Sequence, residues 1–321
     1  MHFPVSGVDC PPYIPPLVAF VISSLLASAG VSGAFLILPF QVSVLGFTSP
    51  AVSPTNLIYN IVAIPGGVYR YIREGRMAWP LTWVVIAGTL PGLVAGVLIR
   101  IRYLPDPRSF KLFVGLVLLY LGGRLLYELT GRSQVGREQR LALARKFQQR
   151  VQEQKAAGSA LAAGLPSDAV VKTRSISMRK IEYEFWGETF SFSPITILIL
   201  ALVVGLIGGI YGIGGGAIIA PFVVAILGLP VYTVAGAALL GTFLSSVAGV
   251  ALFELFSLTS LGAGAPIRPD WALGALFGVG GLFGTYVGAR LQKFLPERWL
   301  RLFLGLLVTG LALSYIAQFF L

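Results

Sequence analysis

Eight long apolar runs, separated by polar segments, dominate this chain. They cover residues 17–45, 51–69, 79–100, 109–129, 195–228, 231–256, 270–289 and 299–321. Most hold about 20 residues, the length that an α-helix needs to cross a hydrocarbon core of roughly 30 Å. They lack the apolar–polar alternation of an outer-membrane barrel strand. The pattern therefore predicts an all-α polytopic membrane protein.

The last four runs repeat the first four. Matching residues are 182 positions apart through the first two runs of each half, and 192 apart after a longer loop in the second half. The aligned pairs include Gly30 with Gly212, Gly33 with Gly215, Pro39 with Pro221, Asn60 with Thr242, Trp79 with Trp271 and Gly88 with Gly280. Such self-similarity indicates two homologous membrane halves.

The repeat divides the chain into four parts. They are an N-terminal lead-in at 1–16, a first membrane repeat at 17–129, a basic loop at 130–193 and a second membrane repeat at 194–321. Within the loop, residues 137–154 carry an apolar stripe at helical spacing. Residues 181–193 alternate around Trp186-Gly187, which predicts a small hairpin. The loop is either a packing element or a regulatory or docking module.

The first run of each half is interrupted by glycines. It is longer than the roughly 20 residues of one upright crossing. We therefore expect two short half-helices that meet at GVSG (30–33) or GIGGG (212–216). If each broken run is a re-entrant hairpin, the halves are inverted and there are six crossings. If each run crosses, the halves are parallel and there are eight.

Loop charge chooses between the two topologies. With the 130–193 loop inside, inversion places seven flanking basic residues inside and five outside, whereas parallel halves place four inside and eight outside. Basic residues favour the cytoplasmic side. The distribution favours inverted-topology repeats.

Composition narrows the class of protein. With 56% hydrophobic and 12% charged residues, the chain falls far below the roughly 25% charge of a soluble domain. Part of the formal net charge of +11 comes from residues 131–193, which hold 11 Lys and Arg against 6 Asp and Glu. Because loops rich in Lys and Arg stay in the cytoplasm, we expect this segment to be a cytoplasmic loop. No nucleic-acid-binding motif accompanies its positive charge. One Cys and one His leave no ligand set for a metal, and no cofactor is expected.

Ser32 lies between glycines in the first broken run, which raises the alternative of a membrane serine protease. Such an enzyme needs a base within hydrogen-bond reach of the hydroxyl. The single histidine is His2, 15 residues before the first apolar run. Ser32 also aligns with Gly214, so the second half bends without a hydroxyl. We expect a protein that is not an enzyme.

The two breaks form the candidate binding site. The N-terminus of a half-helix offers free N–H groups and the positive end of the helix dipole to an anion, and glycine lets a ligand approach closely. The backbone candidates are Gly30, Ser32, Gly33, Gly212, Gly214, Gly215 and Gly216. The side-chain candidates are Thr55, Asn56, Asn60, Thr242 and Ser245. Close packing through small residues is the alternative, and we favour it for Gly88, Gly92, Gly96, Gly280, Gly284 and Gly288.

The segments GIGGGAIIAPFVVAILGLP (212–230), GVSGAFLILPFQVSVLGF (30–47) and VAGAALLGTF (234–243) resemble the TauE/SafE sulfite exporter family, also called the 4-toluene sulfonate uptake permeases. The resemblance covers 17–129 and 195–321. It implies transport of small sulfur-containing anions, such as sulfite or organosulfonates, across the cytoplasmic (inner) membrane. The first half departs from the glycine pattern at Ser32 and Ala34, which leaves the substrate open.

We therefore expect a multi-pass secondary transporter of small anions, with export as the favoured direction. Its expected partners are the anionic substrate and the lipid bilayer, and assembly into a homo-oligomer stays open. No carboxylate lies at a midplane position, so a coupled proton would travel on the substrate or by way of Glu254. The alternatives are a transporter of the same fold for another small anion or metabolite, and a membrane sensor that uses the 130–193 loop.

Overall fold

The computed structural model describes residues 1–28, 31–127, 129, 149, 161–162, 165–166, 170–259, 266–291 and 297–320. Gly30 lies outside these residues, as does the helix expected at 137–154 apart from residue 149.

The first half consists of a short lead-in hairpin followed by helices. Its elements are β1 (His2–Phe3), β2 (Val8–Asp9), α1 (Ile14–Ser28), α2 (Ala34–Ser43), α3 (Val52–Ala63), α4 (Pro65–Arg73), α5 (Trp79–Arg102) and α6 (Pro107–Tyr127). The connecting loop holds β3 (Leu161–Ala162), β4 (Leu165–Pro166), β5 (Val171–Ile176), β6 (Ile181–Phe185) and β7 (Glu188–Phe192). The second half holds α8 (Pro194–Tyr211), α9 (Gly216–Leu227), α10 (Val231–Ser257), α11 (Trp271–Leu291) and α12 (Glu297–Phe320).

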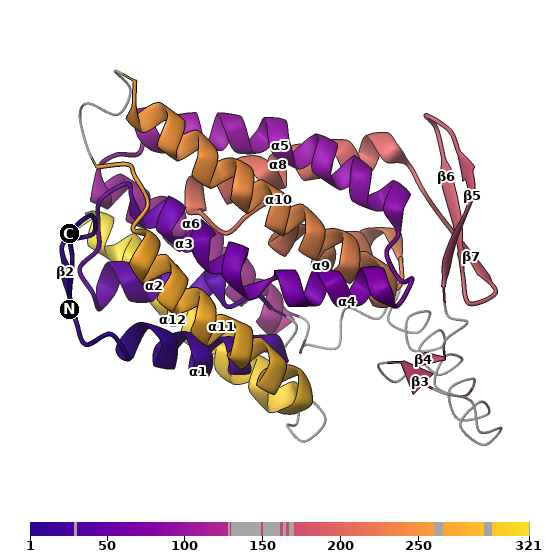
Figure 1. The fold of residues 1–321 in the computed structure, drawn as a ribbon, viewed down its shortest axis with the longest axis horizontal. Helices are drawn as coiled ribbons and strands as arrows, with labels where there is room; N and C mark the ends of the chain where they lie inside the picture. The colour runs from indigo at the N-terminus through magenta and orange to yellow at the C-terminus, as the bar shows by residue number, and fades with distance from the viewer. Residues whose placement is uncertain are drawn as a thin grey trace.

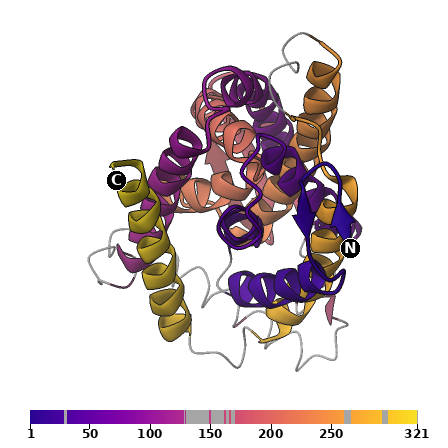
Figure 2. The ribbon, with the colours of Figure 1, turned by 90° about the vertical axis from the view of Figure 1, so that its left-hand side faces the viewer.

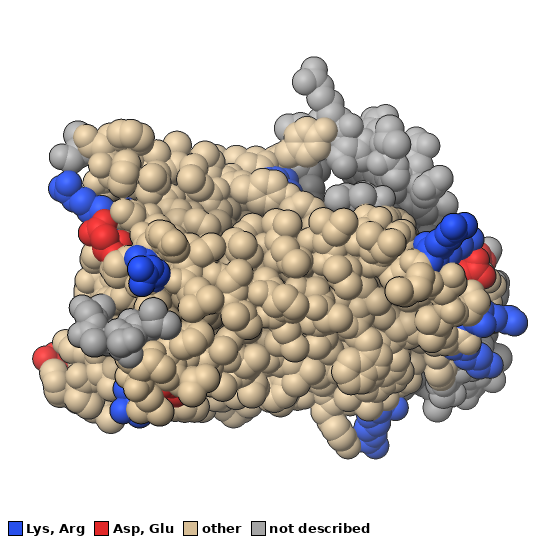
Figure 3. Space-filling view, turned by 90° about the horizontal axis from the view of Figure 1, so that it is seen from above, with Lys and Arg blue, Asp and Glu red and all other residues tan. Residues whose placement is uncertain are grey.

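The helices form an all-α membrane bundle. Six are long and apolar enough to cross a membrane, within the described residues: Trp79–Arg102, Pro107–Tyr127, Pro194–Tyr211, Thr233–Ser257, Trp271–Gly288 and Leu302–Phe320. On the face drawn in Figure 3, most charged residues gather at the two ends of the long axis, with a broad uncharged band between them. This is the distribution that a bilayer requires, because charge in the hydrocarbon region is costly.

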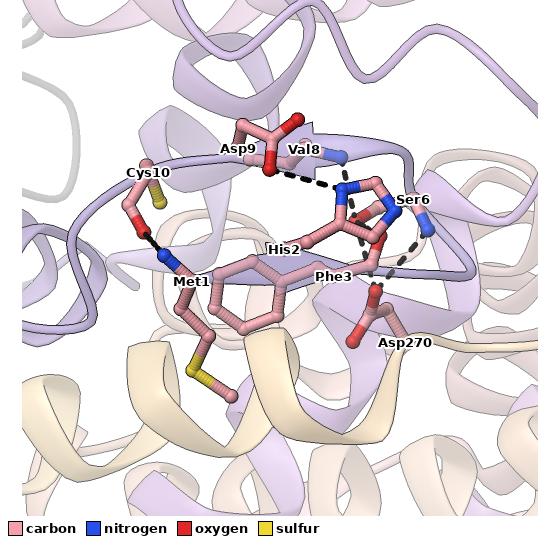
Figure 4. Close-up of polar contacts among 8 residues, drawn as sticks. All are labelled: Met1, His2, Phe3, Ser6, Val8, Asp9, Cys10 and Asp270. Carbon is pink, nitrogen blue, oxygen red and sulfur yellow. Dashed lines mark hydrogen bonds and ion pairs between the residues drawn. The ribbon is translucent and has the colours of Figure 1, made fainter.

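At one end of the bundle, which we call the terminal end, the lead-in hairpin meets the second half. The amide and hydroxyl of Ser6 both donate to Oδ2 of Asp270, as Figure 4 shows. Oδ1 of Asp270 accepts from the amide of Leu273 in the first turn of α11. The amide of Ala51 donates to the carbonyl of Pro266. Both chain termini lie at this end (Figures 1 and 2).

At the opposite end, which we call the loop end, the β5–β7 sheet meets the membrane helices (Figure 1). The amide of Val171 donates to the carbonyl of Gly75, between α4 and α5. The hydroxyls of Tyr183 on β6 and Thr233 on α10 lie 2.9 Å apart. The sheet therefore contacts the bundle at two places that are far apart in sequence.

These contacts show the path of the chain. Ser6 precedes α1 and Ala51 follows α2, so the α1–α2 pair starts and finishes at the terminal end. Tyr183 precedes α8 and Thr233 follows α9, so the α8–α9 pair starts and finishes at the loop end. The stretches α3–α4, α5 and α10 run between the terminal end and the loop end, and α6, α11 and α12 extend from the terminal end toward the loop end (Figure 1).

The first helix of each half packs against the other half. Helix α8 packs on α5, and α1 packs on α11. At Gly92 and Gly284, a Cβ would lie closer than 3.0 Å to backbone atoms of α8 and α1 respectively. Gly88, Gly96, Gly280 and Gly288 are crowded in the same way. The predicted packing role of all six glycines is confirmed, because any side chain would push the paired helices apart.

The second run of the first half is broken where its counterpart is continuous. Helix α3 ends before Ile64 and α4 begins at Pro65, whereas α10 continues through the aligned residue, Val247. Proline lacks an amide hydrogen and its ring clashes with the carbonyl four residues earlier, so it starts a new helix at this point.

The predicted hairpin in the loop is confirmed. Strands β6 and β7 pair antiparallel, with Phe185 opposite Glu188. The two turn residues have positive φ angles, 51° at Trp186 and 76° at Gly187. This is the geometry of a tight turn that matches strand twist. Strand β5 adds a third strand on the other side of β6.

Candidate functional site

The second helix break is a short segment between α8 and α9. Helix α8 ends at Tyr211, its C-cap residue Gly212 has a left-handed φ of 88°, and Gly214 has a φ of 74°. Glycine adopts this conformation without the steric cost that other residues meet. Helix α9 then begins after Gly215. The chain thus reverses direction between the two helices.

A polar stripe on α3 holds this break. Ser53, Asn56 and Asn60 are spaced by three and four positions, so they share one helix face. The hydroxyl of Ser53 donates to the carbonyl of Ile210 at 3.0 Å. Asn56 Nδ2 donates to the Gly212 carbonyl at 3.0 Å, and Asn60 Nδ2 to the Ile213 carbonyl at 2.9 Å. The three side chains satisfy carbonyls that the end of α8 leaves without helical partners.

Asn56 also connects the second break to the first. The same Nδ2 that donates to Gly212 donates to the carbonyl of Ala34, the first residue of α2, at 3.1 Å. Nearby, the hydroxyl of Tyr211 donates to the carbonyl of Phe35 at 2.8 Å. The two breaks, far apart in sequence, therefore lie side by side in the bundle.

The N-termini of α2 and α9 consequently start from one region. Neither N-cap residue, Gly33 nor Gly215, makes a side-chain cap hydrogen bond. The amide of Gly215 instead donates to the hydroxyl of Ser245 on α10 at 3.0 Å. Two helix N-termini that start from one place bring together two positive dipole ends, which favours an anion between them.

The first break is held differently. Gly33 has an ordinary right-handed φ of −59°. A Cβ on it would lie 2.5 Å from the hydroxyl oxygens of Ser23 and Tyr59, which are themselves 2.8 Å apart. Ser32 is half-buried, and its hydroxyl accepts from the amide of Ala34 at 3.4 Å. Gly30 lies outside the described residues.

Protein atoms fill the space that side chains would take at the second break. A Cβ on Gly214 would meet Ser246 Oγ at 2.9 Å, and one on Gly215 would meet Thr89 Cγ2 at 2.6 Å. A Cβ on Gly216 would meet Thr242 Oγ1 at 2.5 Å. Close packing therefore disfavours a side chain at each of these glycines, and a ligand would approach the backbone of the break from another direction.

Two predicted site residues bond elsewhere. Thr55 donates to the Ala51 carbonyl at 2.7 Å and accepts from the Asp270 amide at 2.8 Å, so it faces α11. Thr242 touches the second break, but its hydroxyl donates to Ala238 in its own helix at 2.8 Å. Thr55 is therefore separate from the polar stripe, and Thr242 packs against the glycines.

Two buried amide oxygens beside the breaks have no hydrogen-bond partner in the described structure: Gln41 Oε1 and Asn60 Oδ1. Both side chains are fully buried. Their orientation follows from the network, since Asn56 Oδ1 accepts from Gln41 Nε2 and the Ile213 carbonyl accepts from Asn60 Nδ2. A buried acceptor without a donor is costly, so these oxygens suit a ligand or water that donates.

Sequence reasoning missed Ser53 and Arg100, which extend the network toward the terminal end. Ser53 continues the spacing of Asn56 and Asn60, and that periodicity was available in the sequence. Arg100 lies at the end of its apolar run, where a charged residue normally faces water, yet it is fully buried. No sequence signal distinguishes it from its exposed neighbour Arg102.

The possible proton carrier Glu254 lies at the terminal end of α10. Its carboxylate pairs with Arg268 at 3.0 Å and accepts from the indole of Trp271 at 3.0 Å. The helices that carry the breaks and the stripe, α1, α2, α3, α8 and α9, hold no charged residue in their described ranges. These five helices therefore offer an anion only backbone dipoles and neutral polar groups.

Comparison with known proteins gives one family and no individual relative. Searches of curated proteins and of solved structures found no match. The family described as Sulfite exporter TauE/SafE matches residues 16–315, nearly the whole chain. With the apolar helices described above, this match makes the chain a multi-pass membrane protein of transporter type. The protein belongs to the TauE/SafE sulfite exporter family.

Proposed function

We propose that this protein is a secondary transporter that exports small sulfur-containing anions, such as sulfite or organosulfonates, across the cytoplasmic membrane. We place the anion between the N-termini of α2 and α9. The observation that carries this proposal is the double hydrogen bond of Asn56 to Ala34 and Gly212, because it holds both breaks together. The family match supports the class of substrate.

The physical basis of binding is the meeting of two helix N-termini, both on helices that hold no charged residue in their described ranges. Each N-terminus carries roughly half an elementary positive charge, and low surrounding polarity strengthens its effect on an anion. Broken helices whose half-helix ends face a substrate near the midplane are a known transporter design. The unpartnered Asn60 Oδ1 adds an acceptor that the O–H of hydrogensulfite satisfies directly, and that a water molecule satisfies beside a sulfonate.

We further propose that the two membrane repeats, 17–129 and 194–321, are inverted relative to each other. The chain enters the first half at the terminal end and the second at the loop end, and each half begins with a hairpin that returns to its starting end. With the basic 130–193 loop in the cytoplasm, the terminal end faces outward. Exchange between two inverted halves around a fixed site is one route to alternating access.

The direct test is flux of labelled sulfite, and separately of methanesulfonate, into liposomes that contain the purified protein. Asn60→Leu should lower flux about tenfold or more, because it removes the amide that holds Ile213 and leaves an apolar group at the break. Thr82→Val is the matched control. Thr82 is also fully buried, but its hydroxyl bonds only to Ala78 in its own helix.

Wild-type liposomes that move neither anion faster than empty liposomes would contradict the proposal. Flux of other small anions with neither sulfur compound would favour a transporter of the same fold for another substrate. The sensor alternative predicts that deletion of residues 131–169 abolishes a cellular response while anion flux survives. Cross-linking of the purified protein in the membrane tests assembly into a homo-oligomer.

A further inference from the structure

Arg100 is a buried cation without a counterion. Its side chain is fully buried although it lies in the last turn of α5. Among the ion pairs of the described residues, none includes Arg100. An unpaired buried charge is strongly disfavoured unless something compensates it. Its presence therefore requires an explanation.

Neighbouring groups accept hydrogen bonds from two of the three guanidinium nitrogens of Arg100. Nε donates to the hydroxyl of Ser53 at 3.1 Å, and Nη1 donates to the carbonyl of Leu104. The guanidinium carbon lies 3.7 Å from the ring centre of Phe110, which stacks on one face. Nη2 is buried and has no partner in the described structure. One nitrogen with two N–H groups is thus left for a ligand.

The position of Arg100 links it to the helix breaks. Ser53, which accepts from Arg100, donates in turn to the carbonyl of Ile210 at the end of α8. Asn56, which joins the two breaks, lies one helical turn from Ser53 on the same face of α3. Arg100 therefore lies about one turn from the breaks, on the side of the terminal end.

We propose that Arg100 is an anion-binding residue of the transport path, and that its Nη2 group contacts a small monovalent oxyanion on the outward-facing side of the helix breaks. The proposal rests on the anion transport proposed above. A single fixed positive charge is neutralised by a monoanion, whereas a dianion leaves one buried negative charge uncompensated. The expected ligands are monoanions such as a sulfonate or hydrogensulfite, and the disfavoured ones are dianions such as sulfate.

The test compares the concentration of methanesulfonate that gives half-maximal flux in Arg100→Gln and in the matched control Arg102→Gln. Methanesulfonate stays a monoanion across the pH range used, so its charge does not change with conditions. Arg102 lies in the same last turn but is exposed. Arg100→Gln should raise the half-saturating concentration about tenfold or more and change maximal flux less, while Arg102→Gln shifts it less than about twofold.

A structural role for Arg100 would lower stability without moving the half-saturating concentration. Folded Arg100→Gln with the wild-type half-saturating concentration therefore overturns the proposal. If Arg100→Gln does not fold, Arg100→His replaces it, measured at pH 8 where an ordinary histidine is neutral. A wild-type half-saturating concentration in that variant overturns the proposal as well.

Competition in the wild-type protein tests the preference for monoanions. Sulfate should inhibit methanesulfonate flux at least about tenfold more weakly than unlabelled methanesulfonate does. Equal inhibition by the two anions contradicts the single-charge argument. If wild-type liposomes show no flux of either sulfur compound, the proposed function fails and the role of Arg100 fails with it. If the wild-type protein transports methanesulfonate and the Arg100 variants keep its half-saturating concentration, the role of Arg100 is wrong but the proposed function stands.

Discussion

The two helix breaks lie at aligned positions of the sequence, yet they are held by different means. At the second break, Gly212 is left-handed, and the polar stripe of α3 satisfies the neighbouring carbonyls. At the first break, Gly33 is right-handed, as is its aligned residue Gly215, but Gly33 packs against the hydroxyls of Ser23 and Tyr59 whereas Gly215 packs against Thr89. The glycine-interrupted segment is thus present at both breaks, while the side chains that hold it differ.

The source of the difference is the second run of each half. Residues aligned with Ser53, Asn56 and Asn60 are Ala235, Ala238 and Thr242. The first half therefore supplies the polar stripe for the second break, and α10 adds two hydroxyls there: Ser245, which accepts from Gly215, and Ser246, which accepts from Asn60. Once one half carries the polar groups for a shared site, the matching positions of the other half are free to become packing residues.

The largest expected effect separates the glycines of the two breaks. Gly212→Ala forces alanine into a left-handed conformation and places its Cβ 2.7 Å from the Ser53 Cα, which is backbone and cannot rotate away. The strain of about 1–2 kcal/mol adds to an overpacking cost of about 1–3 kcal/mol. Gly33→Ala meets side-chain hydroxyls, so only the overpacking cost applies.

Denaturation of both variants in detergent, followed by tryptophan fluorescence, measures these costs. Equal losses of stability in the two variants would show that the left-handed conformation of Gly212 adds no cost of its own.

The next effect concerns the residue that joins the breaks. Asn56→Leu leaves the Gly212 carbonyl without its side-chain donor and Gln41 Nε2 without its acceptor, at about 1–3 kcal/mol for each buried group, and it removes the bond that ties Ala34 to the second break. Thr242→Val is the control in the other half, because it removes only a bond to Ala238 within its own helix. We expect a loss several times larger for Asn56→Leu, measured by the same denaturation. Comparable losses would argue against the asymmetry.

The third effect compares the hydrogen bonds at the two ends of the bundle, where the α1–α2 and α8–α9 pairs begin. Asp270→Ala removes two bonds from Ser6 and the N-cap of α11, for an expected loss of about 1–2 kcal/mol. Tyr183→Phe removes the single bond to Thr233, for about 1 kcal/mol. Protease accessibility of the N-terminal lead-in should rise in the first variant only. A rise in Tyr183→Phe would show that the two closures are coupled.

The smallest effect is a pH dependence at the loop end. Burial alone would raise the pKa of Glu74, but hydrogen bonds from Arg70 and Arg76 outweigh it, and the pKa lies below its ordinary value of 4.5. A lowered carboxyl pKa contributes stability that is present above pH 4.5 and is lost as the pH falls below it. In Glu74→Gln, the fall in unfolding midpoint between pH 5 and pH 3 should be shallower than in the wild type. An identical fall in both proteins would show that Glu74 does not contribute to the loss of stability at low pH.

Local sequence patterns predicted much of the fold. Apolar runs of about 20 residues predicted the membrane helices, and the alternation around Trp186-Gly187 predicted the hairpin that β6 and β7 form. The small-residue spacing identified the six packing glycines. The break in the second run at Pro65 was readable from the sequence in principle, since proline cannot continue a helix without cost. The aligned run in the other half has valine at this position and forms one continuous helix, so the comparison of the two halves gives no indication of the break.

The sequence by itself determined that this is a helical membrane protein with glycine breaks, because those features follow from hydrophobic length and backbone sterics. Tertiary structure decided which groups meet. It turned Asn56 and Asn60 toward the second break and Thr55 toward α11. It buried Arg100 while leaving Arg102 exposed. Neighbouring residues on a helix point in different directions, and only the packing of other helices determines which direction leads to a partner, to lipid or to a ligand.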